Sequence, residues 1–465
     1  MTSSPKQILA ATESVCPECL ARIPAFRVRR GDDVYLTKVC ETHGVFETIL
    51  WRGEPAYETW VRPKIPTTPQ TPFTQVDRGC PFDCGLCPDH RQQTCTALLE
   101  VTQRCNLRCA FCFASSGNDT ADPNLTTIEG WYRSLLRSGE PCNVQLSGGE
   151  PTLRDDLPAI VALGHTLGFD FIQVNTNGLR FSRDPAYVVS LKDAGLTSVF
   201  LQFDGTDDAI YTTLRGRPLL AEKEATIAAC AERGLGVILV PTLVPGVNTH
   251  AIGDIVRFAL ARAPVVRGVH FQPVSYFGRI PSVPEVRFRD DADRVTIPEV
   301  IRALEAQTDG LVKAAQFIPP GCENSLCSFH GNFIILADGS LFGWTRHQPK
   351  TCGCQPKPAE EGAAESRSFV ARRWAAPEPT PCCSKQKQTA PSSPSLGGWD
   401  AVLERAPTHT FTISGMAFQD AWTLDLERLR DCCIHVVTPD GRVVPFCAYN
   451  LTARDGRALY RGSME

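Results

Sequence analysis

The stretch Val101-Thr-Gln-Arg-Cys105-Asn-Leu-Arg-Cys109-Ala-Phe-Cys112 follows the apolar run 96–101, which predicts a buried strand. Three thiolates with the spacing C-x3-C-x2-C can ligate three corners of a cubane iron–sulfur cluster and leave the fourth iron without a protein ligand. An open iron is a site for chemistry, whereas four thiolates close a cluster for electron transfer or structure. We therefore expect Cys105, Cys109 and Cys112 to be catalytic cluster ligands.

A second motif, Gly148-Gly-Glu-Pro151, follows another apolar run, 143–146. The cysteine triad, the aromatic residue Phe111 within it and this downstream motif together resemble the radical S-adenosylmethionine (SAM) superfamily. The resemblance implies that a [4Fe–4S] cluster binds the methionine end of SAM and cleaves it to a 5′-deoxyadenosyl radical. It also implies four residues that hold the amino group of SAM, with the glutamate as a charge-assisted acceptor: Gly148, Gly149, Glu150 and Pro151.

Two polar residues at the ends of later apolar runs are further candidates for the cofactor site. Asn175 and Asp204 each follow a run that predicts a strand. Either residue could contact the ribose of SAM, or shape the turn in which it lies. The sequence leaves both roles open.

Composition excludes several classes of protein. A length of 465 residues predicts a core domain with satellites, and a net charge of −4 without a basic stripe argues against a nucleic-acid partner. Residues 1–30 lack a secretion-signal pattern and no long apolar run occurs, so we expect a soluble cytoplasmic protein without a transmembrane segment. In such a protein, 21 cysteines indicate metal ligation rather than disulfides.

Residues 96–273 alternate between apolar runs and amphipathic patterns, which predicts an α/β fold with a parallel sheet. Six such units suit a partial (β/α)6 barrel, in which chemistry gathers at the carboxyl ends of the strands. The expected strands are 97–101, 143–146, 171–175, 198–203, 236–243 and 268–273. The expected helices are 127–138, 155–167, 185–194, 222–233 and 250–263.

The chain divides into five expected parts. Residues 1–65 form a rubredoxin-like or zinc-ribbon-like metal module, 66–95 a linker that carries an auxiliary iron–sulfur cluster, and 96–285 the partial barrel. Residues 286–348 and 399–465 form a C-terminal auxiliary-cluster module. Residues 349–398 are rich in Pro, Ser, Ala, Gln and Lys, which predicts a low-complexity surface insertion.

The N-terminal module contains two short metal-binding motifs. Cys16 and Cys19, followed by Cys40 and His43, supply three thiolates and one imidazole for a tetrahedral site. Zinc and mononuclear iron both accept that ligand set, and the sequence does not separate them. A structural zinc ribbon without a catalytic role is one interpretation of this module.

A second cysteine group repeats the spacing of the catalytic triad. Cys80, Cys84 and Cys87 also spell C-x3-C-x2-C, but they follow no predicted strand and Leu86 stands where an aromatic residue is expected. Cys95 can supply a fourth ligand, which would close this cluster. We therefore expect an auxiliary cluster here.

A last group of ligands is discontinuous. The expected quartet of a further auxiliary cluster is Cys322, Cys327, Cys432 and Cys447, with Cys433 as an alternative to Cys432. Cys142 and Cys230 lie in apolar surroundings and are expected in the core. No role follows from the sequence for the cysteines of the insertion, Cys352, Cys354, Cys382 and Cys383.

The order of these groups resembles one branch of the superfamily, the class D radical SAM methyltransferases and the similar tetraether lipid synthases. The segments that carry the resemblance include 78–90, 201–205, 239–248, 271–275 and 439–450. The resemblance implies one N-terminal mononuclear iron or zinc, the SAM cluster and two auxiliary [4Fe–4S] clusters. Reduction of the SAM cluster further implies an electron donor such as ferredoxin or flavodoxin.

The resemblance implies two alternative reactions. In one, a carbon of a pterin-like or other small substrate acquires a one-carbon unit, with methylenetetrahydrofolate as the donor. In the other, two unactivated lipid chains are joined. A peptide maturase would need a peptide-docking winged module, and a nucleic-acid methylthiolase would need a basic stripe; neither is readable in the sequence. A non-enzymatic electron carrier would leave residues 148–151 without a role. The methyltransferase-like reaction is our first hypothesis.

Overall fold

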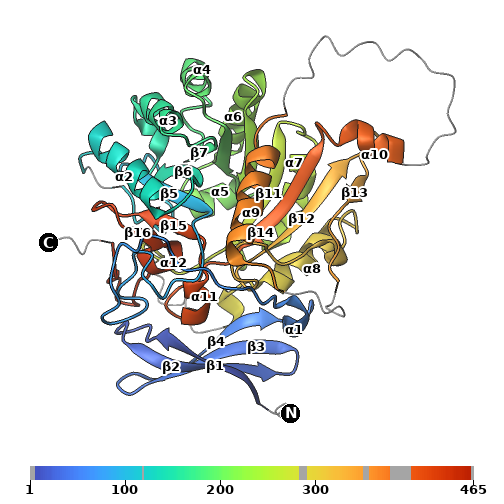
Figure 1. The fold of residues 1–465 in the computed structure, drawn as a ribbon. Helices are drawn as coiled ribbons and strands as arrows, with labels where there is room; N and C mark the ends of the chain where they lie inside the picture. The colour runs from blue at the N-terminus through green and yellow to red at the C-terminus, as the bar shows by residue number, and fades with distance from the viewer. Residues whose placement is uncertain (1–5, 118–119, 282–290, 349–355, 378–398, 462–465) are drawn as a thin grey trace.

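The computed structural model describes residues 6–117, 120–281, 291–348, 356–377 and 399–461 (Figure 1). Two sheets organise this part of the chain, a four-stranded antiparallel sheet at the N-terminus and a 12-stranded mixed sheet. None of the described helices is both long and apolar enough to cross a bilayer.

The N-terminal sheet comprises β1 (Gln7–Val15), β2 (Arg22–Arg30), β3 (Asp33–Cys40) and β4 (Gly44–Arg52), followed by α1 (Tyr57–Trp60). It packs beneath the rest of the molecule (Figure 1). Alternate residues of β3, including Val34 and Leu36, are fully buried, and Lys38 on the same face donates to the backbone carbonyl of Ala421 at 2.6 Å. The Asp425 carboxylate accepts from Arg27 at 2.6 Å, which ties the sheet to the C-terminal segment.

The six strands that the sequence predicts for the barrel are all present. They are β5 (Thr96–Thr102), β6 (Asn143–Gly148), β7 (Ile172–Thr176), β8 (Ser198–Gln202), β9 (Gly236–Val240), which continues as β10 (Thr242–Leu243), and β11 (Val266–Pro273). Neighbours in the order β11-β9-β8-β7-β6-β5 pair in parallel. Their Val, Leu and Ile runs are buried, as expected for strands covered on both faces.

Helices connect these strands, as the alternating pattern predicts. They are α2 (Leu125–Ser138), α3 (Leu157–Thr166), α4 (Pro185–Asp193), α5 (Asp208–Arg215), α6 (Leu220–Glu232) and α7 (Ile252–Leu260), with the short 3-10 turns η1 (Pro151–Leu153) and η2 (Thr249–Ala251). The sequence did not predict α5, which is only eight residues long. Asp207 caps its first turn by accepting from the backbone N–H of Ala209.

C-terminal segments extend the barrel sheet at both edges. β14 (Thr410–Met416) pairs in parallel with β11, and β15 (Ile434–Val437) pairs in parallel with β5. The edges continue through β12 (Ser328–Ile335), β13 (Leu341–Gly343) and β16 (Val443–Pro445). The C-terminal segments therefore share one sheet with the barrel. The remaining elements are α8 (Ile297–Gln307), α10 (Trp399–Arg405), α11 (Leu426–Arg430), α12 (Phe446–Tyr449), η3 (Asp291–Asp293) and η4 (Ala314–Gln316).

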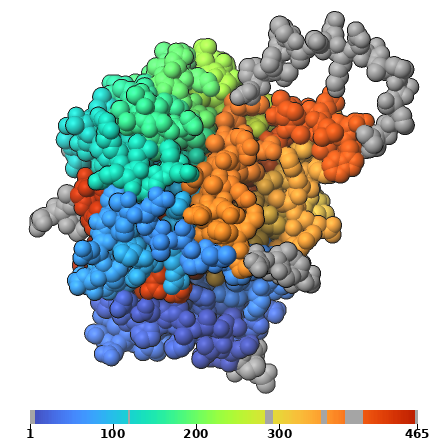
Figure 2. All heavy atoms as spheres, viewed as in Figure 1, coloured from blue at the N-terminus to red at the C-terminus, as the bar shows by residue number. Residues whose placement is uncertain are grey.

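The expected surface insertion is wrong for part of residues 349–398. Residues Ala359–Trp374 form a 16-residue helix, α9, whose residues Ala359 and Ala363 are buried. Ala, Glu and Arg dominate this segment and favour a helix, but the biased composition of its flanks hid the pattern. In Figure 2 the orange atoms of α9 lie between blue and cyan atoms on one side and yellow-orange atoms on the other. The four cysteines of the insertion lie outside the described residues.

Candidate active site

A cavity of about 760 Å³ lies on the inner face of the barrel strands. We call it the chamber. Its walls include the carboxyl ends of the barrel strands, residues of β12 and β14, and the inward side chains of α9. Cys105, Cys109 and Cys112 all line it, as do Gly148, Gly149, Glu150 and Asn175. The structure therefore brings most of the expected catalytic and cofactor residues to one surface.

The loop that carries the three catalytic cysteines is held by the segment after β11. Cys112 and Arg279 exchange two backbone hydrogen bonds, of 2.9 and 3.0 Å, and Arg279 Nε donates to the carbonyl of Cys109 at 3.0 Å. Gly278 has a φ of +53°, and a Cβ there would press on the carbonyl oxygens of Cys112 and Phe113. Burial raises the pKa of the Cys105 thiol to about 12, so a bound cation is needed to hold it as a thiolate near neutral pH.

Both glycines of the downstream motif are required by a close approach to that loop. The N–H of Gly149 donates to the carbonyl of Thr102, and the N–H of Glu150 donates to the carbonyl of Arg104, each at 2.8 Å. A Cβ on Gly148 would overlap the carbonyl oxygen of Thr102, and one on Gly149 would overlap that of Arg104. Glycine therefore lets the motif pack directly against the residues that precede Cys105.

The carboxylate of Glu150 is buried and fixed in orientation. Oε1 accepts from Thr152 N–H at 3.1 Å, Thr152 Oγ1 at 2.6 Å and Thr176 Oγ1 at 2.7 Å, and Oε2 accepts from Asn177 N–H at 2.7 Å. A carboxylate has about four acceptor sites, so Oε2 retains capacity for a further donor such as an ammonium group. Pro151 begins η1 and is buried outside the chamber lining, so it shapes the turn.

The two weaker cofactor candidates differ in their surroundings. Asn175 lines the chamber and donates to Gln145 Oε1 at 3.2 Å, while its own Oδ1 is buried without a partner among the described residues. That atom is an available acceptor for a ligand hydroxyl. Asp204 is fully buried and absent from the described lining of the chamber, so the structure favours the alternative role of this residue in shaping its turn. Both of its carboxylate oxygens accept from Arg215, which does line the chamber.

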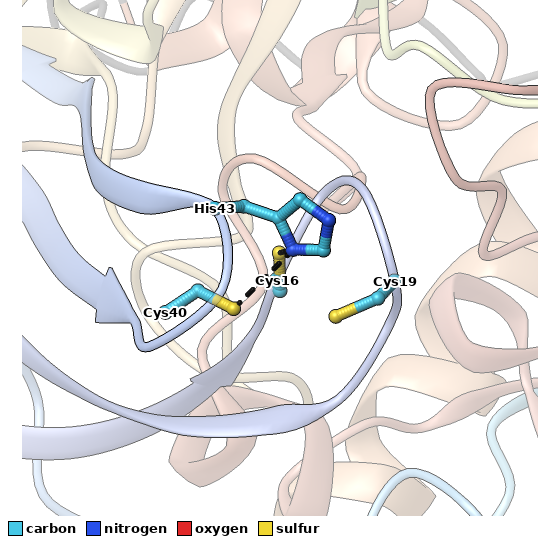
Figure 3. A group of neighbouring side chains, drawn as sticks. All are labelled: Cys16, Cys19, Cys40 and His43. Carbon is cyan, nitrogen blue, oxygen red and sulfur yellow. Dashed lines mark hydrogen bonds between the residues drawn. The ribbon is translucent and has the colours of Figure 1, made fainter.

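The N-terminal ligands come together as the sequence predicts. The ligand atoms of Cys16, Cys19, Cys40 and His43 all lie within 4.8 Å of one another (Figure 3). His43 Nδ1 lies 3.6 Å from Cys16 Sγ and 3.5 Å from Cys40 Sγ. The hydrogen bond from His43 lowers the pKa of Cys40 to about 6, whereas burial raises that of Cys16 to about 11. Three sulfurs and one imidazole at one point fit a tetrahedral metal ion.

The two expected auxiliary quartets are wrong in their pairing of cysteines. Cys95 lies with Cys322 and Cys433, all within 4.8 Å, and Cys95 and Cys322 form a disulfide in this structure, which the sequence did not predict. We call these three residues the base thiols. The pairing of β5 with β15 explains the grouping, because it sets Thr96 beside Ile434, and the N–H of Cys95 donates to the carbonyl of Cys433 at 2.8 Å. All three base thiols line the chamber.

Six further cysteines form two groups. Cys80, Cys84 and Cys87 interact with one another, and the contact with Cys84 raises the pKa of Cys80 to about 12. Burial raises the pKa of Cys447 to about 12 and that of Cys432 well above its ordinary value, with Cys327 as a neighbour of both. Arg428 donates to the Cys327 sulfur at 3.4 Å. Buried thiols gathered in this way fit ligation of iron–sulfur clusters.

Sequence reasoning missed three residue sets of the site. Arg279 and Arg215 carry no motif that marks them, and Arg215 ends α5, a helix that the sequence did not predict. The residues of α9 that line the chamber, among them Val370 and Trp374, were hidden by the composition of the insertion. Ala363, Val370 and Trp374 are seven and four residues apart, which fits the helical period of 3.6, and this spacing was the available signal.

Comparison with known proteins shows the family to which the chain belongs. The radical SAM superfamily matches residues 99–259, and the HMPTM N-terminal zinc ribbon domain matches residues 8–52. The 7,8-dihydro-6-hydroxymethylpterin dimethyltransferase of Methanocaldococcus jannaschii is 33% identical over 482 aligned residues, which cover 95% of this chain and 94% of the relative. A probable GTP 3′,8-cyclase of Methanothermobacter thermautotrophicus is 28% identical over 38% of this chain and 58% of its own length.

Among solved structures, Streptococcus suis SuiB bound to its precursor peptide SuiA has a TM-score of 0.38 at 16% identity, covering 48% of this chain and 47% of that one. The alignment with the pterin dimethyltransferase covers 95% of this chain and so includes the ribbon, the barrel and the C-terminal segments. The chain therefore belongs to the radical SAM superfamily of enzymes, in the class D methyltransferase-like branch to which the 7,8-dihydro-6-hydroxymethylpterin dimethyltransferase is related.

Proposed function

We propose that this enzyme attaches a one-carbon unit to a carbon atom of a small pterin-like heterocycle. The relation to the pterin dimethyltransferase supports this proposal, because it covers nearly the whole of both chains rather than the barrel alone. The substrate class is taken from that relative and from the chamber together.

The chamber is the observation that carries the proposal. Its volume of about 760 Å³ falls in the range of about 300–1,000 Å³ typical of small-molecule sites. Neutral amides from three strands line it, namely Gln145, Gln202 and Gln272. Gln145 and Gln202 each use one donor and one acceptor site within the protein, and each amide keeps further donor and acceptor capacity, which matches the mixed donors and acceptors of a pterin edge. Joining two lipid chains would instead need a channel along the length of both chains.

The residues at the carboxyl ends of the strands fit SAM and its cluster. We assign a [4Fe–4S] cluster to Cys105, Cys109 and Cys112. Desolvation raises the pKa of the Cys105 thiol to about 12, so this ligand calls for a bound cation. When bound, this cluster and SAM supply a 5′-deoxyadenosyl radical, which can remove hydrogen from an unactivated carbon. Glu150 Oε2 would accept from the SAM ammonium, the backbone of Gly148 and Gly149 would lie against it, and Asn175 Oδ1 would accept from a ribose hydroxyl.

The remaining ligands suit further metal groups. We assign one auxiliary [4Fe–4S] cluster to the base thiols, which requires reduction of the Cys95–Cys322 disulfide to two thiolates, as dithionite can supply. We assign the other to Cys80, Cys84 and Cys87, with a fourth ligand from the group Cys327, Cys432 and Cys447. The ribbon site of Cys16, Cys19, Cys40 and His43 would hold one zinc or iron ion. Methylenetetrahydrofolate as the one-carbon donor and ferredoxin or flavodoxin as the electron donor complete the proposal.

Anaerobic reconstitution with iron, sulfide, SAM and dithionite tests the proposed function. We expect 5′-deoxyadenosine and, with 6-hydroxymethyl-7,8-dihydropterin and methylenetetrahydrofolate, a pterin heavier by one or two methyl groups. Labelling the folate methylene with ¹³C should label the product, whereas a ¹³C methyl group on SAM should not. Cys109→Ala should abolish both products, and Cys142→Ala, a buried cysteine outside the ligand groups, should retain them.

Each contrary outcome is informative. Absence of 5′-deoxyadenosine from the reconstituted enzyme would contradict the radical chemistry. Formation of 5′-deoxyadenosine without any change of the pterin would contradict the substrate. Transfer of the label from SAM would contradict the donor.

A further inference from the structure

Helix α9 lies across the amino-terminal ends of the barrel strands. Asn143, the first residue of β6, donates to the carbonyl of Arg367 at 3.3 Å, and Arg267, near the start of β11, donates to the carbonyl of Arg373 at 3.0 Å. The carbonyl of Trp374 occupies the place of a Cβ on Gly236, the first residue of β9. These contacts place α9 at the end of the barrel opposite to the catalytic cysteines.

The helix is anchored along its whole length. At its beginning, the N–H of Ala359 donates to the carbonyl of Ile65 at 2.8 Å. In its first half, Gly362 packs against the carbonyl of Gly321, and the Cys95 sulfur lies 3.5 Å from the carbonyl of Ala363. At its end, Arg267 is 2% exposed and also donates to Thr408 O and Thr410 Oγ1, each at 2.7 Å. Such anchoring makes α9 a fixed wall.

Aromatic rings fill the far end of the chamber. The Trp374 ring stacks on Phe200 of β8 with a centroid distance of 5.7 Å and an interplanar angle of 23°, and its edge meets His270 of β11 at 6.1 Å. All three rings line the same cavity as Cys105. Burial lowers the pKa of His270 to about 4, so this end of the chamber carries a neutral imidazole at pH 7.

We propose that α9 forms the floor of the substrate chamber and that Trp374 sets the length of the molecule that the chamber accepts. The proposal rests on the proposed function, because it assigns the specificity of that same chamber. The reacting carbon must face the catalytic cysteines, so the opposite end of a bound molecule points towards Trp374. A compact heterocycle fits between the two ends, and a long substituent meets the indole ring.

The test compares substrates of increasing length. Two series of 7,8-dihydropterins carry linear alkyl substituents at C6 or on the 2-amino nitrogen, and kcat/KM is measured for wild type, Trp374→Ala and Trp374→Phe. The informative substrate carries the shortest substituent that wild type does not accept. For this substrate, we expect Trp374→Ala to raise the ratio of its kcat/KM to that of the unsubstituted pterin by about tenfold over the ratio in wild type. One methylene in a filled pocket changes discrimination by about 10–200-fold. The longest substituent that Trp374→Phe accepts should lie between those of wild type and Trp374→Ala.

Trp399→Ala is the matched control. It removes the same side chain from α10, where Trp399 is 59% exposed and lies outside the described chamber lining. The longest substituent that Trp399→Ala accepts should be the same as for wild type. Iron and sulfide content after reconstitution should equal that of wild type in both alanine variants, because neither tryptophan belongs to a cysteine ligand group. A normal value shows that each variant is folded.

A crystal structure of Trp374→Ala under xenon provides a readout that needs no substrate. We expect xenon beside Phe200 in a space that is continuous with the chamber, because apolar cavities of this kind bind xenon. If α9 closes over the space, or if neither pterin series shifts its limit in an active variant, the proposal is wrong while the proposed function stands. If no dihydropterin reacts in any variant, the proposed function is wrong, and the xenon structure still decides the role of Trp374.

Discussion

The Arg215 guanidinium and the Asp204 carboxylate form a two-point ion pair, with Nε–Oδ2 and Nη2–Oδ1 distances of 2.7 Å each, at side chains that are 6% and 0% exposed. Asp204 Oδ1 also accepts from the N–H of Thr242 at 3.1 Å. Arg215 reaches the chamber from this pair and interacts with Cys109. The pair therefore fixes a cation beside the catalytic cysteines.

Asp204→Asn should destabilise the protein and weaken SAM cleavage. The substitution leaves Arg215 buried without its counter-charge, and removing one partner of a buried pair costs about 3–5 kcal/mol of unfolding free energy. Asp254→Asn is the matched control, because its pair with Arg257 is about half exposed and such pairs contribute about 0–1 kcal/mol. Denaturant unfolding and 5′-deoxyadenosine formation are the measurements. Equal effects of the two substitutions would contradict a positioning role for Asp204.

Gly149→Ala should lower the rate of 5′-deoxyadenosine formation by about 100-fold, the scale on which a shift of about 1 Å acts on catalysis. The new Cβ would overlap the carbonyl oxygen of Arg104 and push the motif away from the cysteine loop. Gly130→Ala in α2 meets no atom within 4 Å and should stabilise the protein by up to about 1 kcal/mol through helix propensity. Thermal unfolding of both variants separates loss of fold from loss of alignment. Wild-type rates in Gly149→Ala would refute the close packing of this motif.

The barrel could be predicted from the sequence because each strand carries its own signal. Runs such as 198–203 and 236–243 are mostly apolar, and each is followed by a polar turn and an amphipathic helix. The catalytic cysteines and Gly148–Glu150 are local motifs, so their meeting at one edge follows from the parallel order of the strands. Helix α9 could not be placed in the same way, since contacts with distant segments, among them β6, β9 and β11, hold it inside the fold.

The pairing of the auxiliary cysteines depends on contacts between distant parts of the chain. Cys95 belongs with Cys433 because β15 adds to the edge of the sheet beside β5, and no local pattern announces that edge. Asp204 is a second residue whose contacts do not follow from the local sequence. Its position at the end of a strand was predictable, but its orientation towards Arg215 depends on α5, a helix too short to be predicted.

The ribbon should lose its metal as the pH falls, because protons compete with the metal for its three thiolates and its imidazole. The hydrogen bond from His43 lowers the pKa of the Cys40 thiol from 9.0 to about 6, whereas burial raises that of Cys16 to about 11. His43 therefore favours the Cys40 thiolate, which is present at higher pH and is lost as the pH falls. Metal released into a chromogenic chelator, measured from pH 8 to pH 4, reports the midpoint. His43→Ala should move the midpoint upward by about one pH unit, and an unchanged midpoint would refute the role of His43.

Paired cysteine substitutions distinguish the two possible groupings of the auxiliary ligands. If Cys95 shared a cluster with Cys84, as the sequence alone suggests, the double variant Cys84→Ser/Cys95→Ser would lose one cluster, about four iron atoms. The structure places Cys95 with Cys433 instead, so this variant should lose two clusters, about eight iron atoms. Cys95→Ser/Cys322→Ser should lose only one, because both residues belong to the base thiols, and Cys142→Ser should lose none. Iron and sulfide content after reconstitution measures each loss. A loss of one cluster from the first pair and two from the second would restore the grouping by sequence, because substitutions within one cluster cannot remove more than that cluster.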